Sequence, residues 1–137
     1  MVALVAASRL LAGRRLEGVR LLSSESLWEV LGTGPDGRPT VVAFSAPGCA
    51  ACRTAQKPAL TALQERAGNG VRVIEVDVVE QPRVARVFGV LTVPSTAVLD
   101  PSGAVLAANQ GFATADRLAT QVGLPELEPS GQAVDRS

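Results

Sequence analysis

Two cysteines three positions apart, Cys49 and Cys52, constrain this chain more than any other feature. They directly follow residues 40–45, a run of β-branched and aromatic side chains that predicts a buried strand. After them the pattern becomes helical as far as about Ala67. A disulfide across so short a segment constrains the unfolded chain very little, so it adds little stability. The position of the pair between a strand and a helix therefore indicates redox chemistry.

The predicted helix start gives the two thiols different roles. Backbone N–H groups in the first turn of a helix lack partners, and this end of the helix dipole is positive. Both effects favour a thiolate, and cysteines in such pairs have thiol pKa values of roughly 3.5–7.5 instead of about 8.5. We predict that Cys49 is the exposed nucleophile, which attacks a disulfide and forms a mixed disulfide. Cys52, one turn later, is the more buried resolving thiol.

Composition excludes several classes of site. The chain has no histidine and only two cysteines, so it cannot form a Ser-His-Asp or Cys-His nucleophile. A zinc site would need ligands from a second copy of the chain, and we expect no metal and no cofactor apart from the cysteine disulfide. The 13 basic residues balance the 13 acidic ones, and aromatic residues are few. We therefore expect no nucleic-acid partner. We also expect the protein to be a monomer.

The rest of the chain predicts an alternation of strands and helices. The predicted strands cover residues 19–22, 40–45, 71–78, 95–99 and 104–109, and the predicted helices cover 25–31, 49–67, 82–88 and 114–122. Strands separated by helices favour parallel pairing, while the turn residues 100–103 predict an antiparallel hairpin between the last two strands. We expect an α/β domain over 19–123, with a central mixed sheet flanked by helices, and a disordered tail over 124–137.

The N-terminal leader, residues 1–18, has two interpretations. Its apolar stretch, 2–12, is shorter than the roughly 20 residues that a membrane-spanning helix needs. A signal peptide carries its positive charge before the apolar run, whereas Arg14, Arg15 and Arg20 follow it here. The segment is either an amphipathic leader or the end of a truncated membrane anchor. In the second case the basic residues favour a cytoplasmic domain at the membrane, and we expect a cytoplasmic location.

The segment 41–53, VVAFSAPGCAACR, resembles the strand, active-site turn and helix start of the thioredoxin family. A second marker is Val93-Pro94, followed by Ser-Thr. In that family a cis proline faces the redox pair, and the residue before it forms backbone hydrogen bonds with the substrate. The resemblance covers about 19–123 and implies the thioredoxin fold, with Val93 and Pro94 in substrate binding and Gly111 beside the groove. The peptide-bond isomer at Pro94 cannot be read from the sequence.

This resemblance implies a thiol–disulfide oxidoreductase that contributes to cell redox homeostasis. Its partners would be proteins with disulfides or dithiols, together with an electron donor such as a reductase. The sequence departs from the family around the cysteines. Ser45 and Gly48 stand where tryptophans are common, which implies a smaller and less apolar mouth. The dipeptide between the cysteines is Ala-Ala instead of Gly-Pro, and Pro58 lies one position beyond the usual helix kink.

A further departure concerns proton transfer. Thioredoxins bury an acid beneath the second cysteine with a lysine nearby, and the corresponding positions here are Ala43 and Val73, both apolar. Without that acid, water or another carboxylate must take the proton that Cys52 loses. Glu75 and Asp77 are nearby in the sequence, but we expect them to be solvated acids at the end of a strand. We predict that the mixed disulfide is released more slowly than in a protein with the buried acid.

The sequence thus supports a thiol–disulfide oxidoreductase that exchanges with protein disulfides through Cys49 and Cys52, running as a reductase. One alternative is a binding module that holds a partner strand at Pro94 and turns over poorly. Another is a redox enzyme dedicated to a single client protein. The electron donor, the redox potential and the client do not follow from the sequence.

Overall fold

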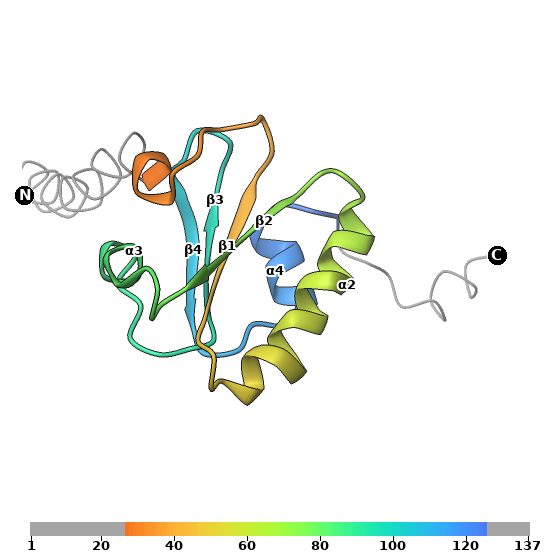
Figure 1. Cartoon of the computed structure of the whole chain (residues 1–137). Coiled ribbons are helices and arrows are strands. Elements are labelled where there is room, and N and C mark those ends of the chain that lie inside the picture. Colours follow the sequence, from red (N-terminus) through yellow and green to blue (C-terminus); the bar gives the residue numbers. More distant parts are fainter. Residues whose placement is uncertain (1–26, 126–137) are drawn as a thin grey trace, which may run out of the picture.

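The computed structural model describes residues 27–125. The leader 1–18, the predicted strand at 19–22 and all but the first two residues of the tail 124–137 lie outside the described residues. Figure 1 shows a central sheet with helices on both of its faces. Among the helices in the described range, none is long and apolar enough to cross a membrane.

The sheet contains four strands: β1 (Thr40–Ser45), β2 (Arg72–Asp77), β3 (Ser95–Leu99) and β4 (Val105–Gln110). They lie in the order β2-β1-β3-β4. β1 and β2 are parallel, whereas β3 is antiparallel to both β1 and β4. The predicted mixed sheet and the hairpin are confirmed, and the predicted strand ends are correct to within one residue.

The expectation of parallel pairing for strands separated by helices is right for β1 and β2 and wrong for β3. The connecting helix α3 (Pro82–Val87) has six residues, which span only about 9 Å at 1.5 Å per residue. A strand of six residues is about twice as long. The chain therefore stays at the end of the sheet where β2 stops, and β3 starts there and runs back beside β1.

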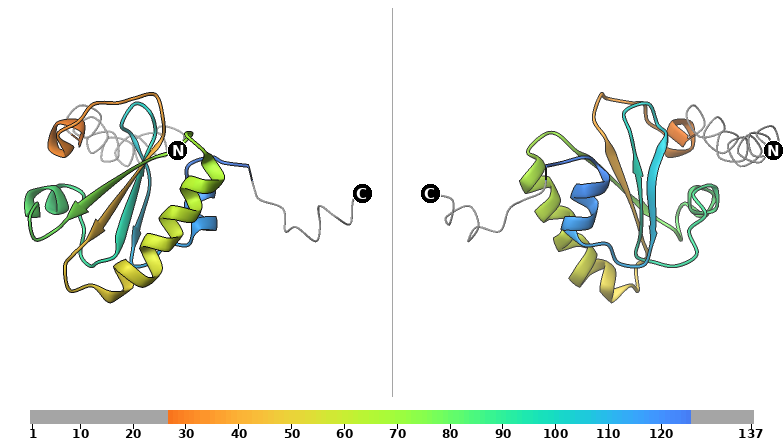
Figure 2. Two further views of the ribbon diagram at one scale, coloured as in Figure 1. Left: turned by 45° about the vertical axis from the view of Figure 1, so that its right-hand side comes forward. Right: turned by 180° about the vertical axis from the view of Figure 1, so that it is seen from behind.

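Two helices, α2 (Lys57–Ala67) and α4 (Ala115–Gln121), cover one face of the sheet, while α3 and the helical residues 27–31 cover the other (Figures 1 and 2). The alternation along β1 explains both layers. Val41 and Ala43 belong to the core cluster under α2 and α4. Val42 and Phe44 belong to the cluster on the opposite face. Burial of both faces of β1 accounts for its unbroken apolar run, Val41–Phe44.

The helix after the cysteines is not uniform. Residues 50–51 are α-helical, the π-helical turn η1 covers Cys52–Gln56, and α2 follows. In η1 the N–H of Lys57 donates to the carbonyl of Cys52, five residues earlier. Pro58 has no N–H to donate, so the regular ladder is interrupted at the next position. The helix is therefore irregular just before Pro58, where it forms a π turn, a feature that often marks functional sites.

Candidate active site

Cys49 and Cys52 are joined by a disulfide at the carboxyl end of β1, where the helix begins. Cys52 is 7% exposed, while Cys49 is only half-buried. The N–H of Cys52 donates a hydrogen bond to Sγ of Cys49 at 3.1 Å. This confirms the predicted difference in exposure, and it places a donor where negative charge on Cys49 would be stabilised. The roles of nucleophile and resolving thiol remain predictions.

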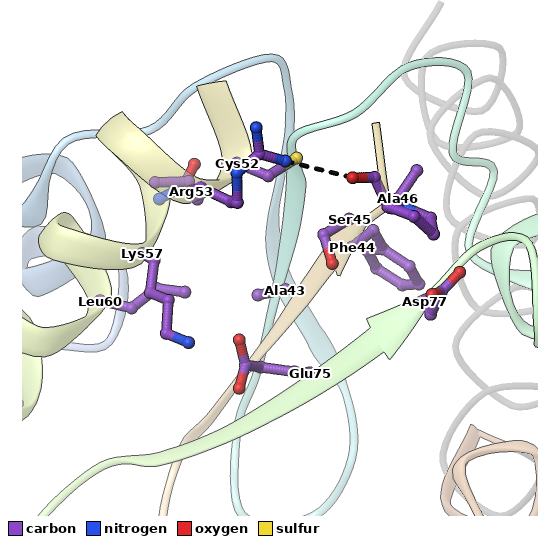
Figure 3. A pocket seen from close by; sticks show the side chains of 12 residues that line it. Ala43, Phe44, Ser45, Ala46, Cys52, Arg53, Lys57, Leu60, Glu75 and Asp77 are labelled. Carbon is purple, nitrogen blue, oxygen red and sulfur yellow. Dashed lines mark hydrogen bonds between the residues drawn. The ribbon is translucent and has the colours of Figure 1, made fainter. Parts of the chain in front are cut away.

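A cationic side chain lies beside the redox pair. The Arg53 guanidinium Nη1 donates to the carbonyl of Pro47 at 3.1 Å and to that of Cys49 at 3.4 Å. These contacts hold a positive charge against the turn that carries Cys49, and the dashed line in Figure 3 marks the first of them. Together with the helix start, Arg53 makes the surroundings of Cys49 electropositive, and such surroundings favour the thiolate.

The strand register brings all of the predicted site segments to one end of the sheet. Phe44 in β1 pairs with Ser95 in β3, and Ser95 pairs with Gln110 in β4. The cysteine turn that follows β1, the loop that precedes β3 and the residue after β4 therefore meet there. The loop contains the predicted substrate-binding residues Val93 and Pro94, which are joined by a cis peptide bond. Pro94 is buried and Val93 is half-buried.

Gly111 follows β4 directly and has a φ of 90°, a conformation that glycine adopts without steric cost. Next to it, Phe112 is 46% exposed. On the loop before Pro94, Leu91 is 88% exposed. The two segments expected to contact substrate therefore each carry an exposed apolar side chain.

Two glutamines that the sequence analysis did not single out hold these segments in place. Gln110 accepts hydrogen bonds from the Leu91 N–H (3.0 Å) and the Ser95 hydroxyl (3.1 Å), and donates to the Gly89 carbonyl (2.8 Å). Gln56, in η1, bonds to both backbone polar groups of Ala113. The only sequence signal for Gln56 is its i, i+4, i+7 spacing with two buried leucines, which places it on the buried helix face.

A cavity of about 200 Å³ opens beside Cys52, between β1, β2 and the helix (Figure 3). Its lining combines an apolar wall with several charged side chains: Ala43, Phe44, Ser45, Ala46, Pro47, Cys52, Arg53, Gln56, Lys57, Leu60, Glu75 and Asp77. As predicted, the position on β1 beneath Cys52 is occupied by the apolar Ala43 and not by an acid. Val73, the other apolar residue predicted there, packs against the core cluster under α2 and α4. Glu75 is exposed to solvent, as expected, but it also lines this cavity, as Asp77 does.

Comparisons with known proteins agree with this architecture. No curated protein sequence matches the chain. Thioredoxin-2, a component of malaria parasite protein secretion machinery, is 26% identical, with a TM-score of 0.59 over 65% of this chain and 84% of that one. The MTB protein dsbF, solved in mixed oxidized and reduced forms, is 25% identical, with a TM-score of 0.52 over 63% of this chain and 79% of its own.

Chloroplastic thioredoxin z shares the fold at 21% identity, with a TM-score of 0.59 over 74% of this chain and 88% of that one. The family pattern described as Thioredoxin matches residues 23–123. That range includes the cysteine pair, the cis proline and every strand of the described sheet. With its strand order and its disulfide at a helix start, the chain belongs to the thioredoxin family of thiol–disulfide oxidoreductases.

Proposed function

We propose that this domain reduces protein disulfides, with Cys49 as the nucleophile and Cys52 as the resolving thiol. The observation that carries the proposal is the asymmetry of the pair: Cys49 is accessible, while Cys52 is 7% exposed and directs its N–H at Sγ of Cys49. An incoming disulfide can approach Cys49 from solvent, whereas the burial of Cys52 leaves little of that residue accessible to a protein disulfide.

The reaction consists of two successive thiol–disulfide exchanges. The Cys49 thiolate attacks one sulfur of the client disulfide, and the other client sulfur leaves as a thiolate. Cys52 then attacks Sγ of Cys49, which forms the intramolecular disulfide and releases the second client thiolate. Two electrons have passed from the cysteine pair to the client, and an external dithiol or reductase must restore them.

The reducing direction is supported by likeness to thioredoxins and by the expected cytoplasmic location, where thiols are kept reduced. Arg14, Arg15 and Arg20, after the apolar leader, support that location and a position near the membrane surface. Equilibration with a glutathione redox buffer tests the direction. We expect a potential nearer to the value of about −270 mV for thioredoxin than to about −120 mV for the oxidant DsbA.

The experiment that tests the activity is reduction of insulin disulfides with dithiothreitol as electron donor. We expect a rate well above the protein-free background, which Cys49→Ser abolishes. Cys52→Ser should retain the first exchange and accumulate a mixed disulfide with insulin. A wild-type rate equal to background would contradict a general reductase.

A domain dedicated to a single client, or a binding module with little turnover, is the alternative. The small side chains of Ser45 and Gly48 favour it, because neither offers an aromatic wall to grip unrelated substrates. A dedicated enzyme would still give a covalent complex through Cys52→Ser. A binding module would retain its partner after Cys49→Ser. The two variants therefore distinguish a dedicated enzyme from a binding module.

A further inference from the structure

The second exchange requires Cys52 to lose a proton, and its surroundings make that loss unfavourable. A free thiol has a pKa of about 8.5, and a thiolate is a far better nucleophile than a thiol. Cys52 is 7% exposed, and burial disfavours a charged group. Ala43, on the strand beneath, has no polar side chain to take the proton. Another route must carry it away.

The cavity beside Cys52 provides that route. Its volume of about 200 Å³ holds several waters at about 30 Å³ each, and its lining is polar enough to bind them. Ala43 lines it, and its methyl side chain leaves open the space that a longer side chain would fill. The cavity therefore connects Cys52 with the charged side chains at its outer rim.

Four titratable side chains besides Cys52 line the cavity: Arg53, Lys57, Glu75 and Asp77. Arginine and lysine are cations near neutral pH and do not accept a proton there. Oδ1 of Asp77 accepts hydrogen bonds from two backbone N–H groups of the turn after β2, at 2.8 and 3.2 Å. Glu75 has no hydrogen-bond or ion-pair partner within the described part of the chain, so its carboxylate is free to bind water.

Strand pairing places the Glu75 side chain on the face of the sheet that borders the Cys52 cavity. Glu75 in β2 pairs with Ala43 in the parallel register of β1, so their side chains are neighbours under the helix. Figure 3 shows Glu75 and Lys57 pointing toward each other from opposite sides of the cavity. Lys57 immediately follows the π turn. The strand thus supplies a carboxylate and the helix an ammonium group at the same opening.

We propose that Glu75 accepts the Cys52 proton through cavity water during release of the mixed disulfide, with the positive charge of Lys57 opposite. As Sγ of Cys52 bonds to Sγ of Cys49, its proton passes through water to the Glu75 carboxylate. The bond between Cys49 and the client sulfur breaks, and the client leaves as a thiolate. Glu75 returns the proton to solvent through the open side of the cavity. The inference rests on the proposed role of Cys52 as the resolving thiol.

Rapid mixing of the reduced full-length chain with Ellman's reagent tests this step without any client protein. The first phase forms the mixed disulfide at Cys49 and releases one thionitrobenzoate. The second phase, attack by Cys52, releases another. We expect Glu75→Gln to slow the second phase by about tenfold or more at neutral pH, on the scale of general-base catalysis, and to leave the first phase unchanged. Glu80→Gln, at an exposed position outside the cavity, is the matched control and should alter neither phase.

The pH profile distinguishes a proton acceptor from a structural role. Where carboxylates are ionised and thiols are protonated, the second-phase rate of the wild type should change little with pH. In Glu75→Gln it should rise about tenfold per pH unit, because hydroxide must then remove the proton. Placing an acid directly beneath Cys52, in Ala43→Asp/Glu75→Gln, should restore the rate.

Two results would overturn the proposal. A second phase in Glu75→Gln within about twofold of the wild type at every pH would exclude Glu75 and leave the proposed function intact. Release of only one thionitrobenzoate by the wild type would show that Cys52 does not resolve the mixed disulfide, which would contradict both the inference and the proposed function.

Discussion

Gln56 and Ala113 are 57 positions apart in the sequence, yet the Gln56 side chain forms hydrogen bonds with both backbone polar groups of Ala113. Nε2 of Gln56 donates to the Ala113 carbonyl at 2.9 Å, and Oε1 accepts from the Ala113 N–H at 3.0 Å. Gln56 is 2% exposed and Ala113 is 1% exposed. This contact joins the helix that carries Cys52 to the segment that carries Gly111.

Gln56→Ala should destabilise the domain, because it leaves the N–H and the carbonyl of Ala113 buried without partners. At about 1–3 kcal/mol for each such group, partly relieved by entering water, we expect the free energy of unfolding to fall by about 2–4 kcal/mol. Urea denaturation measures it. Gln64→Ala, on the exposed side of α2, is the control and should change it little. Equal effects of the two substitutions would show that the contact contributes no stability.

Arg53→Gln should make Cys49 less reactive in the reduced protein. The substitution removes the positive charge that hydrogen-bonds to the carbonyls of Pro47 and Cys49, so the thiolate form of Cys49 loses a stabilising neighbour. We expect alkylation by iodoacetamide at neutral pH to slow by about threefold to tenfold, with salt screening the effect. Arg117→Gln makes the same change in net charge on α4 and should leave the rate unaltered. Equal rates for both variants would contradict a local role of Arg53.

Gln110→Ala should weaken client binding more than it slows chemistry. Its three hydrogen bonds hold the loop before Pro94, and each is worth about 1 kcal/mol, so we expect KM for insulin to rise about fivefold with kcat little changed. Gln110→Glu keeps the two accepting contacts and loses the donor to Gly89, so its KM should be intermediate. Leu106→Ala, on the same strand, is the control. A loss confined to kcat would contradict this prediction.

Asp100 should make stability depend on pH in the acid range. Burial raises the pKa of Asp100, but hydrogen bonds from Ser102, Ala104 and Gly103 outweigh it and hold the pKa below the ordinary value. A lowered pKa in the folded state means that the ionised side chain adds stability above the unfolded pKa, about 3.9. This stability is lost as pH falls through the folded value. In urea titrations, Asp100→Asn should be less stable at neutral pH and approach the wild type in acid, and a difference independent of pH would contradict this.

The local sequence pattern was sufficient to predict most of the described strands and the redox site. Residues 40–45 and 95–99 are strands with the predicted ends, because short, mainly apolar runs rich in β-branched residues and bounded by turn residues have few alternative structures. The cysteine pair could be predicted as a redox site, because its spacing and its position between a strand and a helix are properties of consecutive residues. The helix predicted over 114–122 corresponds to α4, which Thr114 caps: its hydroxyl accepts a hydrogen bond from the N–H of Arg117.

Tertiary structure decided the rest, because the deciding contacts join residues far apart in the chain. The direction of β3 depends on the end of the sheet to which a short helix returns the chain, and no local period encodes that. Glu75 could be placed on a strand from the sequence, but only pairing with Ala43 turns it toward the Cys52 cavity. In the sequence Gln56 is one polar residue of a predicted helix, and only the folded structure reveals its hydrogen bonds to Ala113. Periodicity in a sequence specifies which face is buried, and three-dimensional packing specifies what that face meets.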